Sequence, residues 1–457
     1  MIKKILLLSL VASQLTISCS SEDSPEAVKE PVTEEPVKDK TLAEQIAEII
    51  KQPYSKLTPA DQKIKLEAEA NDMLVQLDKS KSSGAIEAIE NLGRLFSLKH
   101  IDLFDGKSDN GVSEVLNISG VYGIYTWNNT QNIWVKTAST TELKFIFPAK
   151  QSQTTNTATL SSKSTSSTIK FSNVDTYGDS TYNEETGWTT GPSVQDWFFL
   201  PTTVDAILTI DGNQSATLAS TAKYASNKSP EDYTYKVTLN DGYTWEMSGK
   251  KGIQTTSKAS FTYNGKNLIE FNVGSTTDID NLITAPELAQ YRGKANSLVK
   301  IMDNFVIISE ADVVNLGIDS ENLEKSLIDF DFNNKDFYTT ENSNNLKYSQ
   351  GTAASLNKNI KAILASKTDG TKIADIVVHS EEDGIYNPLQ KWIVDATDSN
   401  GGYWTYDQNS TIEVKYYTEV YYLKFNDNTE VAMSVYFSKG FENLNTKFTD
   451  FYTSFNR

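Results

Sequence analysis

Carboxylates and two histidines are the side chains with which this chain could do acid–base chemistry. The sequence of 457 residues holds 60 Asp and Glu, 42 Lys and Arg, two histidines and one cysteine. His379 follows the apolar run 376–378 and precedes the acidic run 381–383, so a histidine–carboxylate pair there could move protons. A surface histidine at the end of a strand is the simpler interpretation, and His100 is interpreted in the same way. Paired carboxylates for glycosidic cleavage remain an alternative, because the sequence does not give their separation in space.

The motifs of the common enzyme classes do not occur in the sequence. GxSxG, HExxH, the P-loop and GxGxxG are missing, which argues against the usual serine hydrolases, zinc proteases and nucleotide-binding folds. Asp329–Asn333 begins like a calcium loop, but Asn334 replaces the turn glycine and Thr340 replaces the bidentate glutamate. We therefore expect no catalytic residue, no cofactor and no metal site, and we interpret this segment as polar with Phe330 and Phe332 in the core.

Charge and arginine content argue against a nucleic-acid partner. The formal net charge is -18, whereas phosphate binding depends on clustered positive charge. Arginine occurs only at Arg94, Arg292 and Arg457, so the bidentate forks that bind phosphates and guanine edges are almost missing. The lone cysteine can form neither an intrachain disulfide nor a metal cluster.

The first eighteen residues have the form of a secretory signal. Met1–Lys4 is a short positive region and Ile5–Ile17 is mostly apolar, too short for a membrane-spanning helix. Thr16-Ile17-Ser18-Cys19 resembles the lipobox of bacterial lipoproteins, in which the cysteine is lipidated and becomes the mature N-terminus. Thr16 stands where the strict pattern has Leu or Val. The resemblance implies that residues 1–18 are a lipoprotein signal peptide and that Cys19 is the lipid attachment site.

Residues 19–40 predict a solvated tether. Seven acidic residues and three prolines lie between Glu22 and Asp39, and such a segment buries too little apolar surface to fold. Fully extended, it could span at most about 70 Å. Acidic residues directly after a lipidated cysteine also resemble the surface-export signal of Bacteroidota lipoproteins. We therefore expect an outer-membrane protein, held by its lipid and exposed on the cell surface.

The rest of the chain predicts helices followed by antiparallel strands. Helical periodicity begins at Thr41, at Thr58-Pro59 and near Ala85. A period of two begins near Leu116, and residues 150–191, rich in Ser, Thr, Asn and Gly, predict a decorated sheet edge or a mobile insertion. Strands between Pro201 and Ser275 alternate with tight-turn dipeptides and predict a meander with one buried face. These dipeptides are Asp211-Gly212, Asp241-Gly242 and Asn264-Gly265.

The C-terminal region predicts more helices and strands. We expect helices from Thr284 through Ala295 to Leu298, and from Thr352 through Leu356 and Ile360 to Ile363. Strands are expected at Lys372–Val378 and within Glu413–Val435. The chain closes on one apolar helical face that predicts a docking helix, made by Phe441, Leu444, Phe448, Phe451 and Phe455.

Clustered aromatic residues suggest a binding surface. These are Tyr177, Tyr182, Trp188, Trp197, Phe198 and Phe199 beside the polar insertion, and Tyr403, Trp404 and Tyr406 after Gly401-Gly402. Exposed rings on polar loops could stack on sugars or contact protein partners. We favour the simpler interpretation that most of them cap the sheets as additional core. A groove would bring Trp188, Trp197 and Trp404 together, whereas core packing would scatter them.

The strand patterns resemble a family of uncharacterised Bacteroidota lipoproteins. The features that carry the resemblance are "GVYGIYTWNNTQNIWVK" with "LKFIFP", the meander "LTIDG … YKVTLNDGYTWEM … ASFTYNGKNLIEF", and the ending "YYLKFNDNTEVAMSVYFSKGFENLNTKFTDFY". They cover most of residues 116–457. The resemblance implies a secreted lipoprotein of unknown function and assigns no active-site residues.

Together these patterns predict an α+β fold, with N-terminal helices packed on mainly antiparallel sheets and a C-terminal docking helix. Residues 41–282 would form a helical segment and an antiparallel β domain. Residues 283–457 would form an α+β region, either separate or continuous with the first. We expect a non-enzymatic binding or structural role at the membrane, with a glycan or protein ligand. The alternatives are a carboxylate-dependent glycan-degrading enzyme and a lipoprotein subunit of an outer-membrane transport or secretion complex.

Overall fold

The computed structural model is mostly β-sheet with a few helices, in agreement with the expected α+β class. It describes residues 42–80, 82–101, 103, 116, 118–176, 180–183, 186–190, 194–225, 230–277, 293–302, 304–329 and 331–438. These residues fall into two compact units. The first unit comprises residues 42–69 and 272–438, and the second comprises residues 70–271.

Several sequence expectations lie outside the described residues. They are the signal peptide, the lipid attachment site Cys19, the tether 19–40, Tyr177 and the docking helix 441–455. Among the described helices, none combines the length and the apolar character that a membrane crossing needs.

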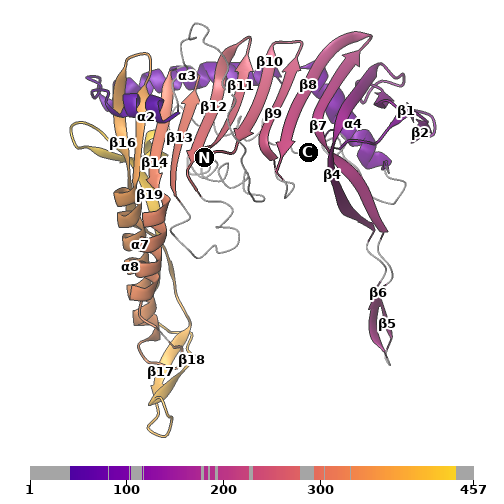
Figure 1. Cartoon of the computed structure of the whole chain (residues 1–457). Helices are drawn as coiled ribbons and strands as arrows, with labels where there is room; N and C mark the ends of the chain where they lie inside the picture. Colours follow the sequence, from indigo (N-terminus) through magenta and orange to yellow (C-terminus); the bar gives the residue numbers. More distant parts are fainter. Residues whose placement is uncertain are drawn as a thin grey trace. The chain divides into compact units, whose positions relative to one another are not determined.

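The second unit is built on a long sheet (Figure 1). The strands follow the order β2-β1-β3-β4-β7-β8-β9-β10-β11-β12. β1 runs parallel to β3. β3 is antiparallel to β4, and each strand from β7 to β11 is antiparallel to the next one. The elements are α4 (Gly84–Leu98), β1 (Gly123–Asn128), β2 (Ile133–Thr137), β3 (Leu143–Phe147), β4 (Ala158–Thr176), β5 (Ser180–Asn183), β6 (Gly187–Thr190), β7 (Val194–Ile210), β8 (Asn213–Tyr224), β9 (Pro230–Leu239), β10 (Tyr243–Lys250), β11 (Thr255–Tyr263) and β12 (Lys266–Ser275).

Tight turns join the strands of the predicted meander. Asp211 and Gly212 have φ of 50° and 77°, and Asn264 and Gly265 have φ of 48° and 75°. Two consecutive positive φ angles are the geometry that matches the twist of two-residue hairpins, and Asp-Gly and Asn-Gly adopt it with little strain. The predicted meander between Pro201 and Ser275 is therefore confirmed as the run β7 to β12.

Residues 158–162 of β4 form part of an inner strand, so the prediction of an edge or a mobile insertion is wrong for them. They pair with β3 on one side and with β7 on the other, whereas the described pairings of residues 163–176 are with β7 alone. Thr and Ser carry no long side chains and Thr favours strands, so a Ser/Thr-rich run can pair on both sides. Leu160 and Ala158 supply the few buried apolar contacts that β4 needs.

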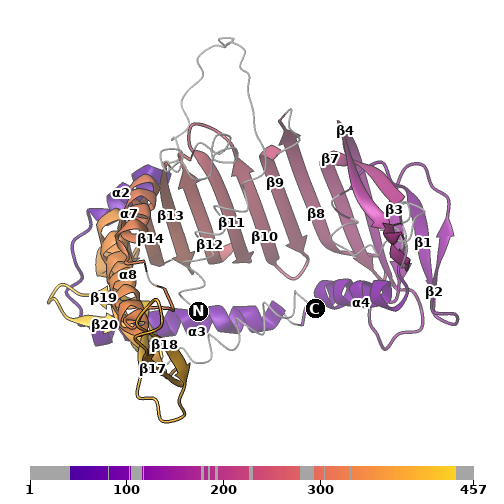
Figure 2. The same cartoon turned by 90° about the horizontal axis from the view of Figure 1, so that it is seen from below.

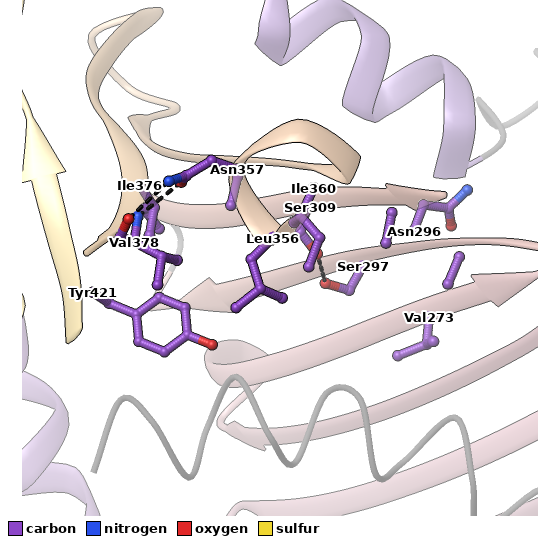
Figure 3. Close-up of a pocket in the computed structure, with 13 residues that line it drawn as sticks. Val273, Asn296, Ser297, Ser309, Leu356, Asn357, Ile360, Ile376, Val378 and Tyr421 are labelled. Atoms are coloured by element: carbon purple, nitrogen blue, oxygen red, sulfur yellow. Dashed lines mark hydrogen bonds between the residues drawn. The ribbon is translucent and has the colours of Figure 1, made fainter. Parts of the chain in front are cut away.

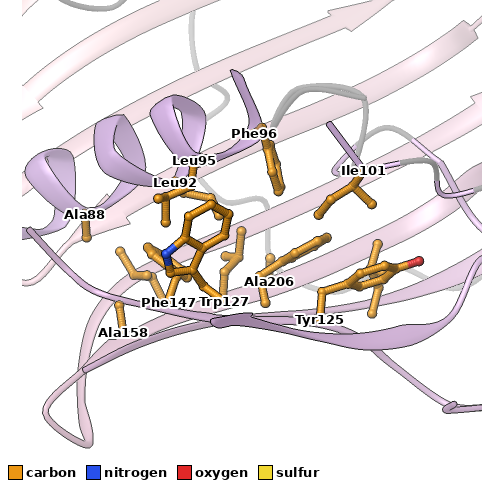
Figure 4. Packing of buried hydrophobic residues seen from close by; sticks show 14 of the residues in the cluster. Ala88, Leu92, Leu95, Phe96, Ile101, Tyr125, Trp127, Phe147, Ala158 and Ala206 are labelled. Atoms are coloured by element: carbon orange, nitrogen blue, oxygen red, sulfur yellow. The ribbon is translucent and has the colours of Figure 1, made fainter. Parts of the chain in front are cut away.

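The core of the second unit lies between α4 and the strands β1, β3, β4 and β7 (Figure 4). Leu92, Leu95 and Phe96 of α4 point towards this sheet face. Phe145 and Phe147 alternate with exposed or half-buried neighbours on β3, in the pattern of a strand with one buried face. The aromatic rings pack edge-on, tilted or stacked at centroid distances of 5.2–6.0 Å.

The apolar face of the meander is only partly covered. Tyr243 and Phe261 are buried, but Trp245 and Met247 of the same strand face are exposed. The expectation of one buried face is therefore wrong at these two positions. The opposite face carries the exposed ion pair between Lys236 and Glu246, at 2.5 Å.

Tyr243 predicts a loss of stability at high pH. Its hydroxyl donates a hydrogen bond to the Gln76 carbonyl of α3 (Pro59–Ser80). Burial first, and then the charges of Tyr263 and Asp241, raise the pKa of Tyr243 to about 12, whereas an unfolded tyrosine has a pKa of about 10. Stability from the neutral hydroxyl is therefore complete below pH 10 and is lost as the pH rises through about 12.

We expect Tyr243→Phe to remove this pH dependence. Between pH 10 and 12 the free energy of unfolding of the parent chain should fall more steeply than that of the variant, by up to about 1.4 kcal/mol per pH unit. Denaturant titrations at several pH values measure the difference. Tyr406→Phe, at an exposed ring of the first unit, is the control, and equal slopes for the parent chain and Tyr243→Phe would contradict the prediction.

In the first unit the strands follow the order β13-β14-β15-β16-β19-β20, and the described pairings between these strands are antiparallel. The remaining elements are α2 (Leu42–Ile50), β13 (Lys294–Ile301), β14 (Phe305–Asp312), α7 (Val313–Ser326), α8 (Phe337–Asn359), β15 (Ile360–Ser366), β16 (Thr371–Tyr386), β17 (Gln390–Val394), β18 (Gly402–Tyr406), β19 (Val414–Lys424), β20 (Glu430–Ala432) and α9 (Met433–Tyr436).

Helices cover both faces of this sheet. Ile46 of α2 packs on Leu298, Ile308 and Ile363, which share one face. Their neighbours Ser297, Ser309 and Ala362 point to the other face, where α8 packs against β15, β16 and β19. Figure 2 shows α7 and α8 side by side.

Two helix predictions in this region are wrong in their last residues. Ala295 and Leu298 lie in β13, and Ile360 and Ile363 lie in β15. Thr352 and Leu356 do lie in a helix, α8, which begins at Phe337 and ends at Asn359, and residues 284–292 lie outside the described residues. Strands buried on both faces are nearly continuous apolar runs, which periodicity cannot distinguish from a buried helix. The strand expected at Lys372–Val378 is confirmed and continues to Tyr386.

Candidate binding surfaces

A small apolar pocket lies in the first unit between α8 and the sheet (Figure 3). Its volume is about 60 Å³, which is too little for a large ligand. Leu356, Ile376, Val378 and Tyr421 line it. Two of its polar groups are engaged with each other, since the hydroxyls of Ser297 and Ser309 are 2.8 Å apart.

Asn357 at this pocket has a structural role. Its side-chain amide donates to the Val378 carbonyl at 2.7 Å and accepts from the Val378 amide at 2.8 Å. Asn342 binds β19 in the same way, donating to the Glu413 carbonyl and accepting from the Lys415 amide, both at 2.6 Å. An asparagine side chain has an N–H donor and a carbonyl acceptor, as a peptide group has. The asparagine side chains of α8 therefore form hydrogen bonds with the backbone next to the helix, as a neighbouring strand would.

His379 lies within β16, not at a strand end as expected. Its Nε2 is 2.6 Å from Glu430 Oε2, and its ring stands edge-on to Tyr422 at 4.7 Å. Lys424 first, and His379 second, hold the pKa of Glu430 below its usual value. Strand alternation places His379 on the face opposite Val378 and therefore away from the pocket. The acidic partner is Glu430 of β20, not the run 381–383 beside it in sequence.

Asp329–Asn333 has the geometry of a turn. Asp331 Oδ1 accepts hydrogen bonds from the Asn333 amide and side chain, both at 2.9 Å. Among the described residues, no group of three or more His, Cys, Asp or Glu could hold a metal. Phe332 is 46% exposed and packs edge-on to Phe337, so its placement in the core was wrong. Phe330 lies outside the described residues.

Trp404 packs inside the first unit and does not face a groove. Its ring contacts Tyr338 at 4.9 Å and Trp392 at 5.4 Å, both edge-on. Its Nε1–H donates to the Asn334 carbonyl at 3.0 Å. These contacts fix the β17–β18 hairpin to the start of α8, as expected for additional core. Tyr403 and Tyr406 beside it are exposed.

The second unit exposes aromatic rings on a two-stranded ribbon. The ladder of β4 and β7 continues from the pair Ser166 and Pro201 to the pair Thr176 and Val194, towards the start of β7. Trp197 is 52% exposed, and Lys170 Nζ lies 4.9 Å above its ring. Phe199, two residues further along β7, is also exposed, and its backbone pairs with Ser119. We call Lys170, Trp197 and Phe199 the Trp197 surface.

The β5–β6 hairpin carries the most exposed aromatic pair of the described residues. Tyr182 and Trp188 face each other across the two strands, with ring centroids 5.3 Å apart and planes inclined by 57°. Their exposed fractions are 62% and 72%. The turn uses Gly187 at a φ of 75° and a hydrogen bond from the Thr186 amide to Asn183 Oδ1. We call this pair the aromatic hairpin.

The structure therefore divides the predicted aromatic set. Tyr182, Trp188, Trp197 and Phe199 are exposed, Phe198 is half-buried against the core, and Trp404 packs in the other unit. Sequence reasoning missed Lys170 and Glu430 as partners of Trp197 and His379. Lys170 and Trp197 are 27 residues apart in the sequence, and His379 and Glu430 are 51 residues apart. Pairing of distant strands brings them together, and no local sequence pattern indicates such a contact.

Comparisons with family models, with curated proteins and with solved structures found no match for this chain.

Proposed function

We propose that this chain is a lipid-anchored protein of the bacterial outer membrane that is exposed on the cell surface and has a non-enzymatic binding role. Its partners would be the membrane, through the lipid on Cys19, and a glycan or protein ligand. The observation that carries the binding role is the aromatic hairpin, because two large rings that face each other across its strands are exposed to water. Solvent-exposed Tyr and Trp are the side chains that most often anchor ligands.

The anchoring part of the proposal is supported by the sequence. A positive start, an apolar run of thirteen residues and one cysteine at its end occur in the order that a lipoprotein signal requires. The acidic segment that follows would keep the folded units at a distance from the membrane. Because the cysteine is the only one in the chain, no disulfide or metal cluster competes for it.

Two features of the fold belong to the same proposal. The N-terminal helices α2, α3 and α4 would act as the helical layer on the sheets, as the packing of Ile46 and Leu92 in two separate cores supports. Residues 441–455 would form a C-terminal docking helix, since their five large apolar residues share one helical face. A chain that carries Phe448→Ser and Phe451→Ser should then lose stability.

Protease treatment of intact cells tests surface exposure. We expect a broad-specificity protease to remove the full-length protein from cells that express it, while a periplasmic marker stays intact. The physical reason is that an acidic, proline-containing tether between the membrane and the folded units would be accessible to the protease. Protection in intact cells, followed by cleavage after the outer membrane is opened, would show that the protein faces the periplasm and would contradict the proposal.

A further inference from the structure

We infer that the aromatic hairpin binds a neutral polysaccharide, with Tyr182 and Trp188 stacking on the apolar faces of its sugar rings and the Trp197 surface contacting the same chain further along. This inference depends on the proposed binding function and names the ligand class of that site. The exposed rings, the size of the hairpin and the charge of the chain support it independently of one another.

The exposed side chains have the chemistry of a stacking site. Between residues 166 and 200, the large apolar side chains whose exposure the structure describes and that are exposed are all aromatic: Tyr182, Trp188, Trp197 and Phe199. The C–H bonds on one face of a pyranose ring carry partial positive charge, and the face of an aromatic ring is negative. Because the rings of Tyr182 and Trp188 are inclined and not stacked on each other, each leaves ring surface for a sugar.

The size of the hairpin favours a sugar chain over a folded protein. β5 and β6 have four residues each, so the hairpin is roughly 13 Å long and about 10 Å wide including side chains. A specific interface between two folded proteins buries about 800 Å² on each partner, which exceeds this footprint several times. One aromatic ring, in contrast, matches one sugar ring in area.

The charge of the molecule favours a neutral ligand. The net charge of -18 repels anionic polymers. Lys170, the cation found at these rings, is already placed over Trp197. Arginine, which recognises carboxylates and sulfates by paired hydrogen bonds, does not occur between residues 95 and 291.

Two ring positions near each other in the sequence favour an extended ligand. Trp197 and Phe199 lie on β7, and Tyr182 and Trp188 lie on the separate hairpin β5–β6, which is inserted in the sequence between β4 and β7. A polymer can contact both the hairpin and the Trp197 surface. Once it is bound at one of them, binding at the other is intramolecular, which raises the overall affinity.

Affinity electrophoresis of the full chain in mild detergent tests the inference. The gels contain amylose, xylan, mannan or laminarin as neutral polymers, or polygalacturonate as an acidic one. We expect at least one neutral polymer to retard the protein, equally at 50 and 500 mM salt, because stacking on a neutral ring is not screened. Trp188→Ala and Tyr182→Ala should each weaken retardation about tenfold.

Matched variants separate stacking from folding. Trp188→Phe keeps a ring and should bind within about threefold of the parent chain, and Tyr406→Ala removes an equally exposed ring of the first unit and should change nothing. Trp197→Ala should weaken binding of the polymer but not of a disaccharide or trisaccharide. Circular dichroism of every variant shows whether the fold is retained.

The possible outcomes distinguish the inference from the proposed function. Retardation by polygalacturonate alone, or loss of retardation at high salt, would overturn the neutral polysaccharide. If no polysaccharide binds but Trp188→Ala abolishes binding to a protein of the cell surface, the ligand class is wrong and the binding function remains. If Trp188→Ala and Tyr182→Ala alter binding to neither class, both proposals are wrong.

Discussion

A chain with Cys19 replaced by alanine should lose all fatty-acid labelling and should leave the outer-membrane fraction. Each methylene of an acyl chain that is buried in the membrane contributes about 0.8 kcal/mol, and several chains would be attached to this one residue. No other thiol can take them, because the chain has no second cysteine. Metabolic labelling with an alkyne fatty acid, combined with membrane fractionation, measures both effects.

Ser20→Ala is the matched control, since it alters the next residue without removing the thiol. Its labelling and its membrane association should equal those of the parent chain. A Cys19→Ala chain that still carries label, or a parent chain that carries none, would show that the resemblance to a lipobox is misleading. The signal would then be an ordinary cleaved one.

Phe145→Ala should destabilise the second unit by about 3–5 kcal/mol, the usual cost of deleting a buried phenylalanine. Phe145 has no solvent exposure, and its ring packs on Phe96 at 5.3 Å and on Tyr125 at 5.4 Å. Alanine would leave a cavity between α4 and β3 that these rings cannot fill. Guanidinium titration, with hydrogen exchange to separate the two units, measures the loss.

Phe199→Ala tests whether the loss of stability in Phe145→Ala comes from the burial of the ring and not from its size. Phe199 is an exposed phenylalanine of the same unit, so its removal should cost less than about 1 kcal/mol. In the Phe145→Ala chain, the amides of the first unit should keep their protection, because its core cluster is made of other residues. Equal losses for the two variants would contradict the assigned core.

Local chemistry explains which parts of the fold could be predicted. Asp211-Gly212 and Asn264-Gly265 determine their turns by themselves, because few other dipeptides accept two positive φ angles. The starts of α2 and α3 were also correct, since capping residues and proline act within one helical turn. These signals depend on residues that are neighbours in sequence.

The errors arise where distant residues decide the structure. The first half of α8 has few apolar residues, and Asn342 and Asn357 hold the helix through hydrogen bonds to β19 and β16. β13 and β15 have buried apolar runs that resemble a helix until their partners are known. For the same reason the aromatic residues could be recognised as a set, but their exposure could not be assigned from the sequence.

The position of α2 at the N-terminal side of the first unit has a mechanical consequence for the proposed anchored protein. Ile46 of this nine-residue helix is fully buried in the first unit. Directly after it, the Ser55 amide and the Pro53 carbonyl form hydrogen bonds with Lys372, each at 2.8 Å. In a chain anchored by its lipid, drag from flowing liquid or a pulled ligand would load α2 first and this short parallel bridge second. The force at which the protein yields would then be determined by Ile46 and Lys372, and not by the long strands.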